Sequence, residues 1–80
     1  MDNLTASGIL RHCGIKHDTV LRVAIHADRV AMNVTINCEY ALVIFSTTLG
    51  GVWQYQINLG DFVLVPEQAA VALQYEVNRA

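Results

Sequence analysis

Charged residues are scarce in this chain of 80 residues: Asp, Glu, Lys and Arg make up 15% of it, and the net charge is −2. Basic residues are rarest, with a single lysine and four scattered arginines. A nucleic-acid-binding protein usually gathers Lys and Arg into a patch that displaces counterions from phosphates. The sequence has no such patch, so we expect neither DNA nor RNA as a partner.

Long apolar runs and leader-like segments are also missing. No apolar stretch approaches the roughly 20 residues that cross a bilayer, and no basic segment precedes an apolar one at the start. We therefore expect a cytoplasmic protein without a membrane partner. Cysteine is scarce too, and Cys13 and Cys38 would be free thiols in that compartment.

Hydrophobic residues, by contrast, make up 54% of the chain. That content excludes disorder and predicts one domain spanning residues 1–80, close to the lower size limit for a core without disulfides or metal. Polar residues are too few to cover such a molecule completely. We therefore expect some apolar surface to contact another protein or a second copy.

Apolar and polar side chains alternate from Thr19 to Val65, which predicts strands rather than helices. Turn-forming residues interrupt the alternation four times, and each proposed turn keeps one face of the sheet apolar. This agreement predicts a five-stranded antiparallel meander. The expected turns are Asp28-Arg29, Asn37-Cys38-Glu39, Thr48-Leu49-Gly50-Gly51 and Gly60-Asp61.

Helices are expected at both ends, which makes the fold class α+β. Residues 1–15 begin with Asp2, Asn3 and Thr5, each a potential N-cap, and end with Gly14, which could take the left-handed C′ position before an apolar Ile15. Residues 66–78 alternate in a way that also fits a sixth strand. Pro66 at the start and the alanines that follow favour a C-terminal helix packed on the sheet.

The proposed turns divide the strand residues between two faces. The first face is the expected core: Val23, Ile25, Met32, Val34, Leu42, Ile44, Trp53, Tyr55, Ile57, Phe62 and Leu64. The second face is mixed, and its apolar members form the predicted partner-binding patch together with two neighbouring glutamines: Val43, Phe45, Val63, Val65, Gln54 and Gln56. The alternative is that a terminal helix covers this face. A Phe45→Asp substitution separates the two readings, since it would abolish binding in one and unfold the protein in the other.

Candidate ligands for a metal or small molecule are limited to His12, Cys13, His17 and Cys38. Their spacing is not that of a paired zinc site, and Cys38 could join the others only if the N-terminal segment lies beside the second turn. Cys13 with a neighbouring histidine could be a nucleophile and base, but free cysteines in small domains usually fill the core. We therefore predict no catalytic residue, metal or cofactor, and keep binding by this cluster as the alternative function.

The leading hypothesis is a small non-enzymatic module that binds another protein and acts by covering its surface. Proteins of this kind include phage and mobile-element inhibitors of host defence systems or host enzymes. The expected contact is the predicted patch or the loop at 48–51, and self-association into a homodimer is the simplest version.

Overall fold

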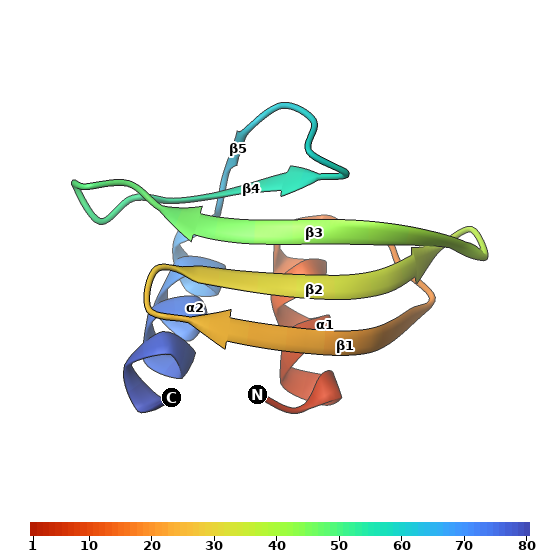
Figure 1. Cartoon of the computed structure of the whole chain (residues 1–80), viewed down its shortest axis with the longest axis horizontal. Helices are drawn as coiled ribbons and strands as arrows, with labels where there is room; N and C mark the ends of the chain where they lie inside the picture. The colour runs from red at the N-terminus through yellow and green to blue at the C-terminus, as the bar shows by residue number, and fades with distance from the viewer.

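The computed structural model describes residues 1–80 and shows a helix, five strands and a second helix (Figure 1). All five strands form one antiparallel sheet in the order β1-β2-β3-β4-β5, which confirms the predicted α+β meander. The elements are α1 (Asn3–His12), β1 (Thr19–His26), β2 (Arg29–Ile36), β3 (Glu39–Thr47), β4 (Trp53–Ile57), β5 (Val63–Leu64) and α2 (Glu67–Arg79).

Helix α1 begins and ends where its sequence indicates. The Asp2 carboxylate accepts a hydrogen bond of 2.7 Å from the Thr5 amide, which identifies Asp2 as the N-cap. At the other end Gly14 has φ +75°, and the Gly14 and Ile15 amides donate to the carbonyls of Arg11 and Leu10. These bonds are those of a Schellman motif, so the predicted glycine ending is confirmed.

The segment after Pro66 is a helix and not a sixth strand, as the proline and the alanines favoured. Ala69 and Leu73 lie four residues apart on its buried face. Both helices pack on the same face of the sheet and lie behind it in Figure 1. The protein therefore has two layers with its core between them, and the opposite face of the sheet, here called the outer face, has no helix over it.

The first hairpin turn has the predicted two residues but lies one residue earlier than the expected Asp28-Arg29. The turn residues are Ala27 and Asp28, so Ile25 pairs with Val30 and Val23 with Met32. This shifts the register by two residues and keeps both strands on their predicted faces. An irregularity at Leu21 then lets Val20 point into the core while Leu21 is exposed.

The β2–β3 connection corrects a prediction. The turn contains two residues instead of three, Asn37 and Cys38, with φ values of 52° and 65°. Positive φ at both central positions is the pattern of a type I′ hairpin turn. The one-residue difference rotates β3, so that Val43 and Phe45 are fully buried and Ile44 lies on the outer face.

The β3–β4 connection contains a second one-residue difference. Thr47 pairs with Trp53, so the connecting loop has five residues, 48–52, instead of four. This second shift cancels the first for β4. Trp53 and Tyr55 face the core as predicted, and Trp53 Nε1 donates to Gln74 Oε1 on α2 at 3.1 Å.

The last predicted turn is also corrected. The chain turns at Asn58 and Leu59, which have φ values of 51° and 61°, and not at Gly60-Asp61. As a result Val63 pairs with Tyr55, and Leu64 lies on the outer side of the sheet. Phe62 and Leu64, both expected in the core, are exposed.

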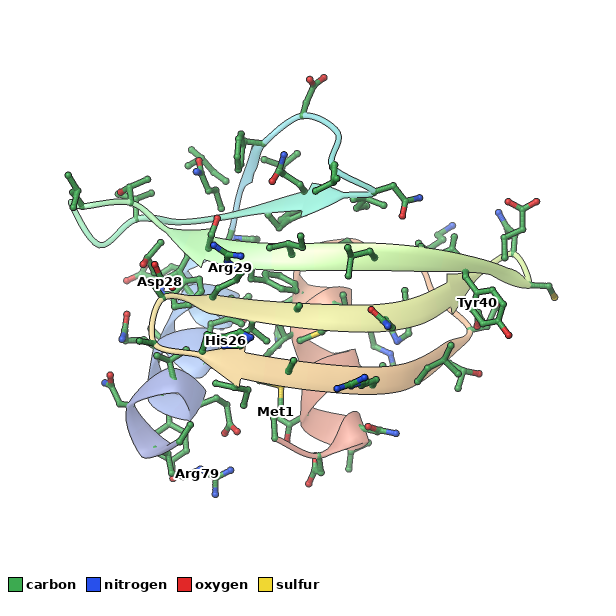
Figure 2. All side chains as sticks on the ribbon, viewed as in Figure 1. Met1, His26, Asp28, Arg29, Tyr40 and Arg79 are labelled. Atoms are coloured by element: carbon green, nitrogen blue, oxygen red, sulfur yellow. The ribbon has the colours of Figure 1, made fainter.

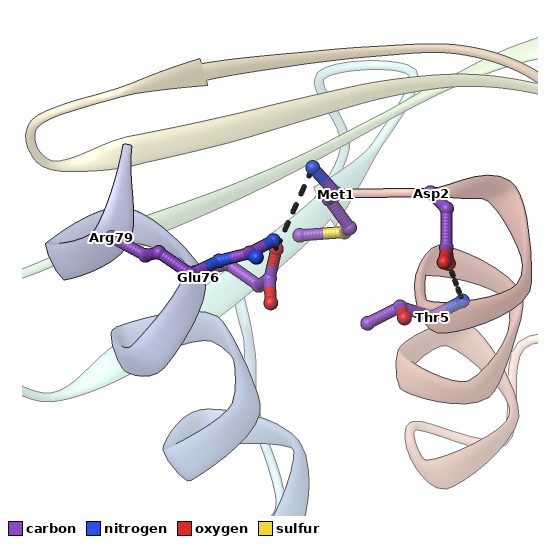
Figure 3. A network of polar contacts seen from close by, with 5 residues as sticks. All are labelled: Met1, Asp2, Thr5, Glu76 and Arg79. Atoms are coloured by element: carbon purple, nitrogen blue, oxygen red, sulfur yellow. Dashed lines mark hydrogen bonds and ion pairs between the residues drawn. The ribbon is translucent and has the colours of Figure 1, made fainter.

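A polar contact joins the two helices behind β1 and β2. The Glu76 carboxylate is buried and lies 3.5 Å from the Met1 ammonium and 3.0 Å from the Arg79 guanidinium (Figure 3). The Met1 side chain is fully buried, while that of Arg79 is mostly exposed. Glu76 thus ties the start of the chain to the last turn of α2.

Candidate functional site

The six residues of the predicted patch do not form one surface. Val43 and Phe45 are in the core, where the Phe45 ring lies 5.9 Å from that of Tyr55. This placement agrees with the alternative interpretation, in which a terminal helix covers this face, because the helix layer lies over the side of the sheet that carries Val43 and Phe45. The other four residues fall into two groups: Val63 and Val65 on or beside β5, and Gln54 and Gln56 on the outer face.

Exposed apolar side chains gather instead along β4, β5 and their turns. Six of the eleven large hydrophobic side chains that are exposed lie between residues 49 and 64. Four of them surround the β4–β5 turn and β5 itself, and we call them the β5 edge patch: Leu59, Phe62, Val63 and Leu64. Val63 is the one residue of the predicted patch that belongs to it.

The β5 edge patch is held in place by the residues before it. Asn58 donates its amide to the Leu42 carbonyl at 2.7 Å, and its side-chain Oδ1 accepts from the Leu42 amide at 2.8 Å. Gln56 Nε2 donates to the Gly60 carbonyl at 2.8 Å across the turn. These bonds attach the turn to β3 and β4, so that the apolar side chains have a fixed position.

The free side of β5 exposes backbone groups as well. The Val65 amide donates to the Trp53 carbonyl at 3.1 Å, toward β4. Hydrogen bonding alternates along an antiparallel strand, so the amides and carbonyls of Phe62 and Leu64 point away from β4. Pro66 ends this free edge because it has no amide to donate.

Charge near the β5 edge patch has one sign. Lysine and arginine are both missing from residues 48–78, whereas Asp61 and Glu67 lie exposed on either side of β5. A partner that covers the patch therefore meets apolar side chains bordered by carboxylates. Basic side chains at the edge of the partner's surface match this arrangement.

The alternative site is the cluster of histidines and cysteines near the end of α1 and the β2–β3 turn. The N-terminal segment does lie beside the second turn, because the Cys38 amide donates to Asp18 Oδ2 at 2.8 Å. However, no three His, Cys, Asp or Glu side chains come together in a group that could hold a metal ion. The cluster of His12, Cys13, His17 and Cys38 therefore does not assemble into a metal site.

Cys13 is a poor nucleophile in this setting. It ends α1 and is half-buried against the core, and this burial raises the pKa of its thiol to about 11. A thiol with such a pKa is almost entirely protonated at neutral pH, and the thiolate is the reactive form. The position fits a core filler, as the sequence indicated.

His17 has a role that the sequence did not indicate. Its Nε2 lies 2.7 Å from Ser7 Oγ, and its Nδ1 lies 3.1 Å from the Ile15 carbonyl. An Nδ1–H donating to the carbonyl leaves Nε2 to accept the serine hydroxyl proton. A nucleophilic serine also needs a substrate site beside it, but the adjacent depression of about 400 Å³ is not lined by Ser7. The pair is best explained as a tie between α1 and the segment leading to β1.

The β5 edge patch was missed because Phe62 to Val65 is apolar at every position, which is typical of a strand buried on both faces. One signal in the sequence pointed elsewhere. Pro66 directly follows this run, and proline within sheets is confined to edges and strand ends. A strand at the edge with only a short pairing segment leaves several of its apolar side chains uncovered.

Comparisons with protein-family models, curated proteins and solved structures found no match to this chain. Neither helix is both long and apolar enough to cross a lipid bilayer. Function is therefore inferred from the surfaces of the molecule itself.

Proposed function

We propose that this chain is a non-enzymatic protein-binding module whose contact surface is the β5 edge patch. The observation that carries the proposal is the concentration of exposed apolar side chains at one corner, where Phe62 is 57% exposed and Leu64 70% exposed. A free strand edge with exposed apolar side chains is a common site for pairing with another chain.

The mechanism is steric. A segment of the partner lies against β5, pairs with the free backbone groups of Phe62 and Leu64, and buries their side chains. Basic residues of the partner then lie near Asp61 and Glu67. The partner loses access to the surface so covered, which for an enzyme or a defence protein means inhibition.

A matched pair of substitutions tests the proposal. Leu64→Lys adds a charge to the patch, and Leu4→Lys makes the same change at a leucine on α1 that is 79% exposed. Each variant is used to capture proteins from an extract of the native host cells, beside the unchanged protein. Because a buried leucine contributes about 1.5–3 kcal/mol, we expect Leu64→Lys to weaken binding of the partner at least tenfold, as measured with the purified pair.

The Leu4→Lys variant is the control for the added charge. Leu4→Lys should retain the partner at the affinity of the unchanged protein, and thermal unfolding followed by circular dichroism should show that both variants fold. Equal retention by both variants would show that the partner binds elsewhere. Equal loss in both would show non-specific capture.

A further inference from the structure

The outer face of the sheet over β1 to β4 is a second surface, which adjoins the β5 edge patch at Leu64. Side chains on it form rows that run across the strands, and none of them is fully buried. Figure 2 places Tyr40 at one end of this face and His26 and Arg29 at the other. The two central rows are Ala24, Ala31, Ile44 and Gln56 in one and Arg22, Asn33 and Leu42 in the other.

Side-chain size changes sharply along these rows. In the first row the small Ala24 and Ala31 leave a shallow trough on β1 and β2, whereas Ile44, and Leu42 in the second row, form a ridge over β3. The trough and the ridge lie side by side on neighbouring strands. A surface of this shape is complementary to itself when a two-fold rotation places the ridge of one copy in the trough of the other.

We propose that the outer face is the interface of a two-fold dimer of this chain, with β2 of one copy over β3 of the other. The two-fold axis runs along the strands, between β2 and β3. Ile44 then contacts the partner's Ala31, and Ala31 contacts the partner's Ile44. The two sheets pack face to face and nearly aligned, as in β-sandwiches.

The other in-plane two-fold axis runs across the strands and fits poorly. It sets β3 on the partner's β3, so that Leu42 and Ile44 press against the same ridge. Ala24 and Ala31 are then held apart from the partner and leave a void, which close-packed interfaces avoid. Shape therefore selects the axis along the strands.

Charge agrees with this choice. On β2 and β3, next to the axis, the two central rows carry no charged side chain, as in the cores of protein interfaces, and Arg22 lies on the edge strand β1. Arg29 pairs with Ser46 across β2 and β3. The same axis therefore brings Arg29 against the partner's Ser46 and not against another arginine.

The overlapping area is enough for a weak dimer. With the axis between β2 and β3, about eight residues of β2 and β3 overlap but only five of β1 and β4, because β4 has five residues. At about 4.8 Å between strands and about 3.3 Å per residue, the overlap covers about 400 Å² on each copy. The total of about 800 Å² is below the size of most specific interfaces, so we expect dissociation at high-micromolar concentrations or above.

The dimer leaves β5 outside the overlap, because β1 lies over the partner's β4. Both β5 edge patches remain free, so one dimer would present two of them and bind a repeated target with increased avidity. This inference does not depend on the proposed function. Loss of the dimer leaves the β5 edge patch intact, and loss of partner binding leaves the dimer intact.

Sedimentation equilibrium of the full chain tests the proposal first, at concentrations up to about 1 mM so that weak dimers are detected. The mass should rise from 8.8 kDa toward twice that value. NMR spectra recorded over the same dilution series should show shifts of the Ala31, Leu42 and Ile44 amides, and none at Val71 on α2. A mass of 8.8 kDa throughout, or shifts on α2 or β5 instead, would overturn the proposal.

Exchange of the trough and ridge residues tests the arrangement. Ala31→Ile fills the trough and Ile44→Ala removes the ridge, so each should weaken the dimer about tenfold. The double variant A31I/I44A exchanges them and should return the dissociation constant to within about threefold of the original. Additive weakening in the double variant would overturn the placement of β2 over β3. Circular dichroism verifies folding, and the dilution series on the unchanged protein decides the question if a variant unfolds.

Discussion

The two halves of the sheet use their apolar residues in opposite ways. Strands β1 to β3 have eight or nine residues each, the helices pack on β1 and β2, and five inward side chains of β2 and β3 are fully buried: Val30, Met32, Val34, Val43 and Phe45. Strands β4 and β5 have five and two residues, and most of the exposed large apolar side chains of the molecule lie on them or on their turns. Stability is therefore concentrated in the first half, while the second half offers its side chains to a partner.

The two free edges of the sheet show the same contrast. At β1 the irregularity near Leu21 disturbs the edge, and Asn3 Nδ2 on α1 donates to the Val20 carbonyl at 3.1 Å. Edge strands protected in this way resist pairing with other chains. At β5 no such side chain covers the edge, and the residues there are apolar. A long edge is protected and a short edge is left open.

Two phenylalanines provide the largest test of this contrast. Phe45→Ala should lower the free energy of unfolding by about 3–5 kcal/mol, because the ring is fully buried and leaves a cavity. Phe62→Ala, in the exposed half, should change it by less than about 1 kcal/mol. Urea unfolding of both variants measures the difference. Similar values for the two would mean that the halves are equally important for stability.

Glu76 tests how the helix layer is closed behind the first half. Glu76→Ala leaves the Met1 ammonium without its partner, and we expect a loss of about 2 kcal/mol. Glu67→Ala, an exposed glutamate at the start of the same helix, should cost less than about 0.5 kcal/mol. Thermal unfolding compares the two. A loss confined to Glu67→Ala would contradict the ion-pair network of Figure 3.

Glycine substitutions in the two hairpin turns with positive φ should stabilise the protein. Cys38 and Leu59 follow an asparagine and have φ values of 65° and 61°, which glycine adopts without strain. Cys38→Gly and Leu59→Gly should each raise the free energy of unfolding by about 0.5–1 kcal/mol. Because one turn lies in each half, a gain at only one of them would show which hairpin is strained.

The smallest effect concerns the thiols. Cys38 is exposed in the β2–β3 turn, whereas burial raises the pKa of the Cys13 thiol to about 11. At pH 8 a thiol reagent should modify Cys38 promptly and Cys13 slowly, and the rate at Cys13 should increase as the pH approaches 11. Mass spectrometry of the modified peptides follows each site. Equal rates at pH 8 would mean that the C-terminal end of α1 opens readily.

The sequence was sufficient for the element order because periodicity and capping agreed. Asp2, Gly14 and Pro66 marked the helices, and alternation from Thr19 onward marked the strands. Faces were predicted correctly for β1, β2 and β4. The turn between β1 and β2 has the predicted length, so both strands keep their faces. The turn before β3 is one residue shorter than predicted and the loop after it is one residue longer, so the two errors cancel for β4.

Strand β3 was assigned to the wrong face for a local physical reason. It is apolar on both sides, so Val43 and Ile44 are equally suited to the core, and only the turn length decides between them. The Asn37-Cys38 turn lacks the second glycine that identifies a type I′ hairpin, as does Asn58-Leu59. The error at Asn37-Cys38 put the buried Val43 and Phe45 in the predicted patch, and the error at Asn58-Leu59 put the exposed Phe62 and Leu64 in the predicted core.

The reciprocal bonds between Asn58 and Leu42 have a consequence for recognition. The side-chain oxygen of Asn58 accepts the hydrogen bond that a backbone carbonyl would otherwise accept. The hydrogen-bond ladder between β3 and β4 therefore continues one residue beyond the end of β4. The turn that follows is thereby already in its final shape before any encounter. A binder meeting this corner loses little freedom on docking, and more of the contact energy is available as affinity.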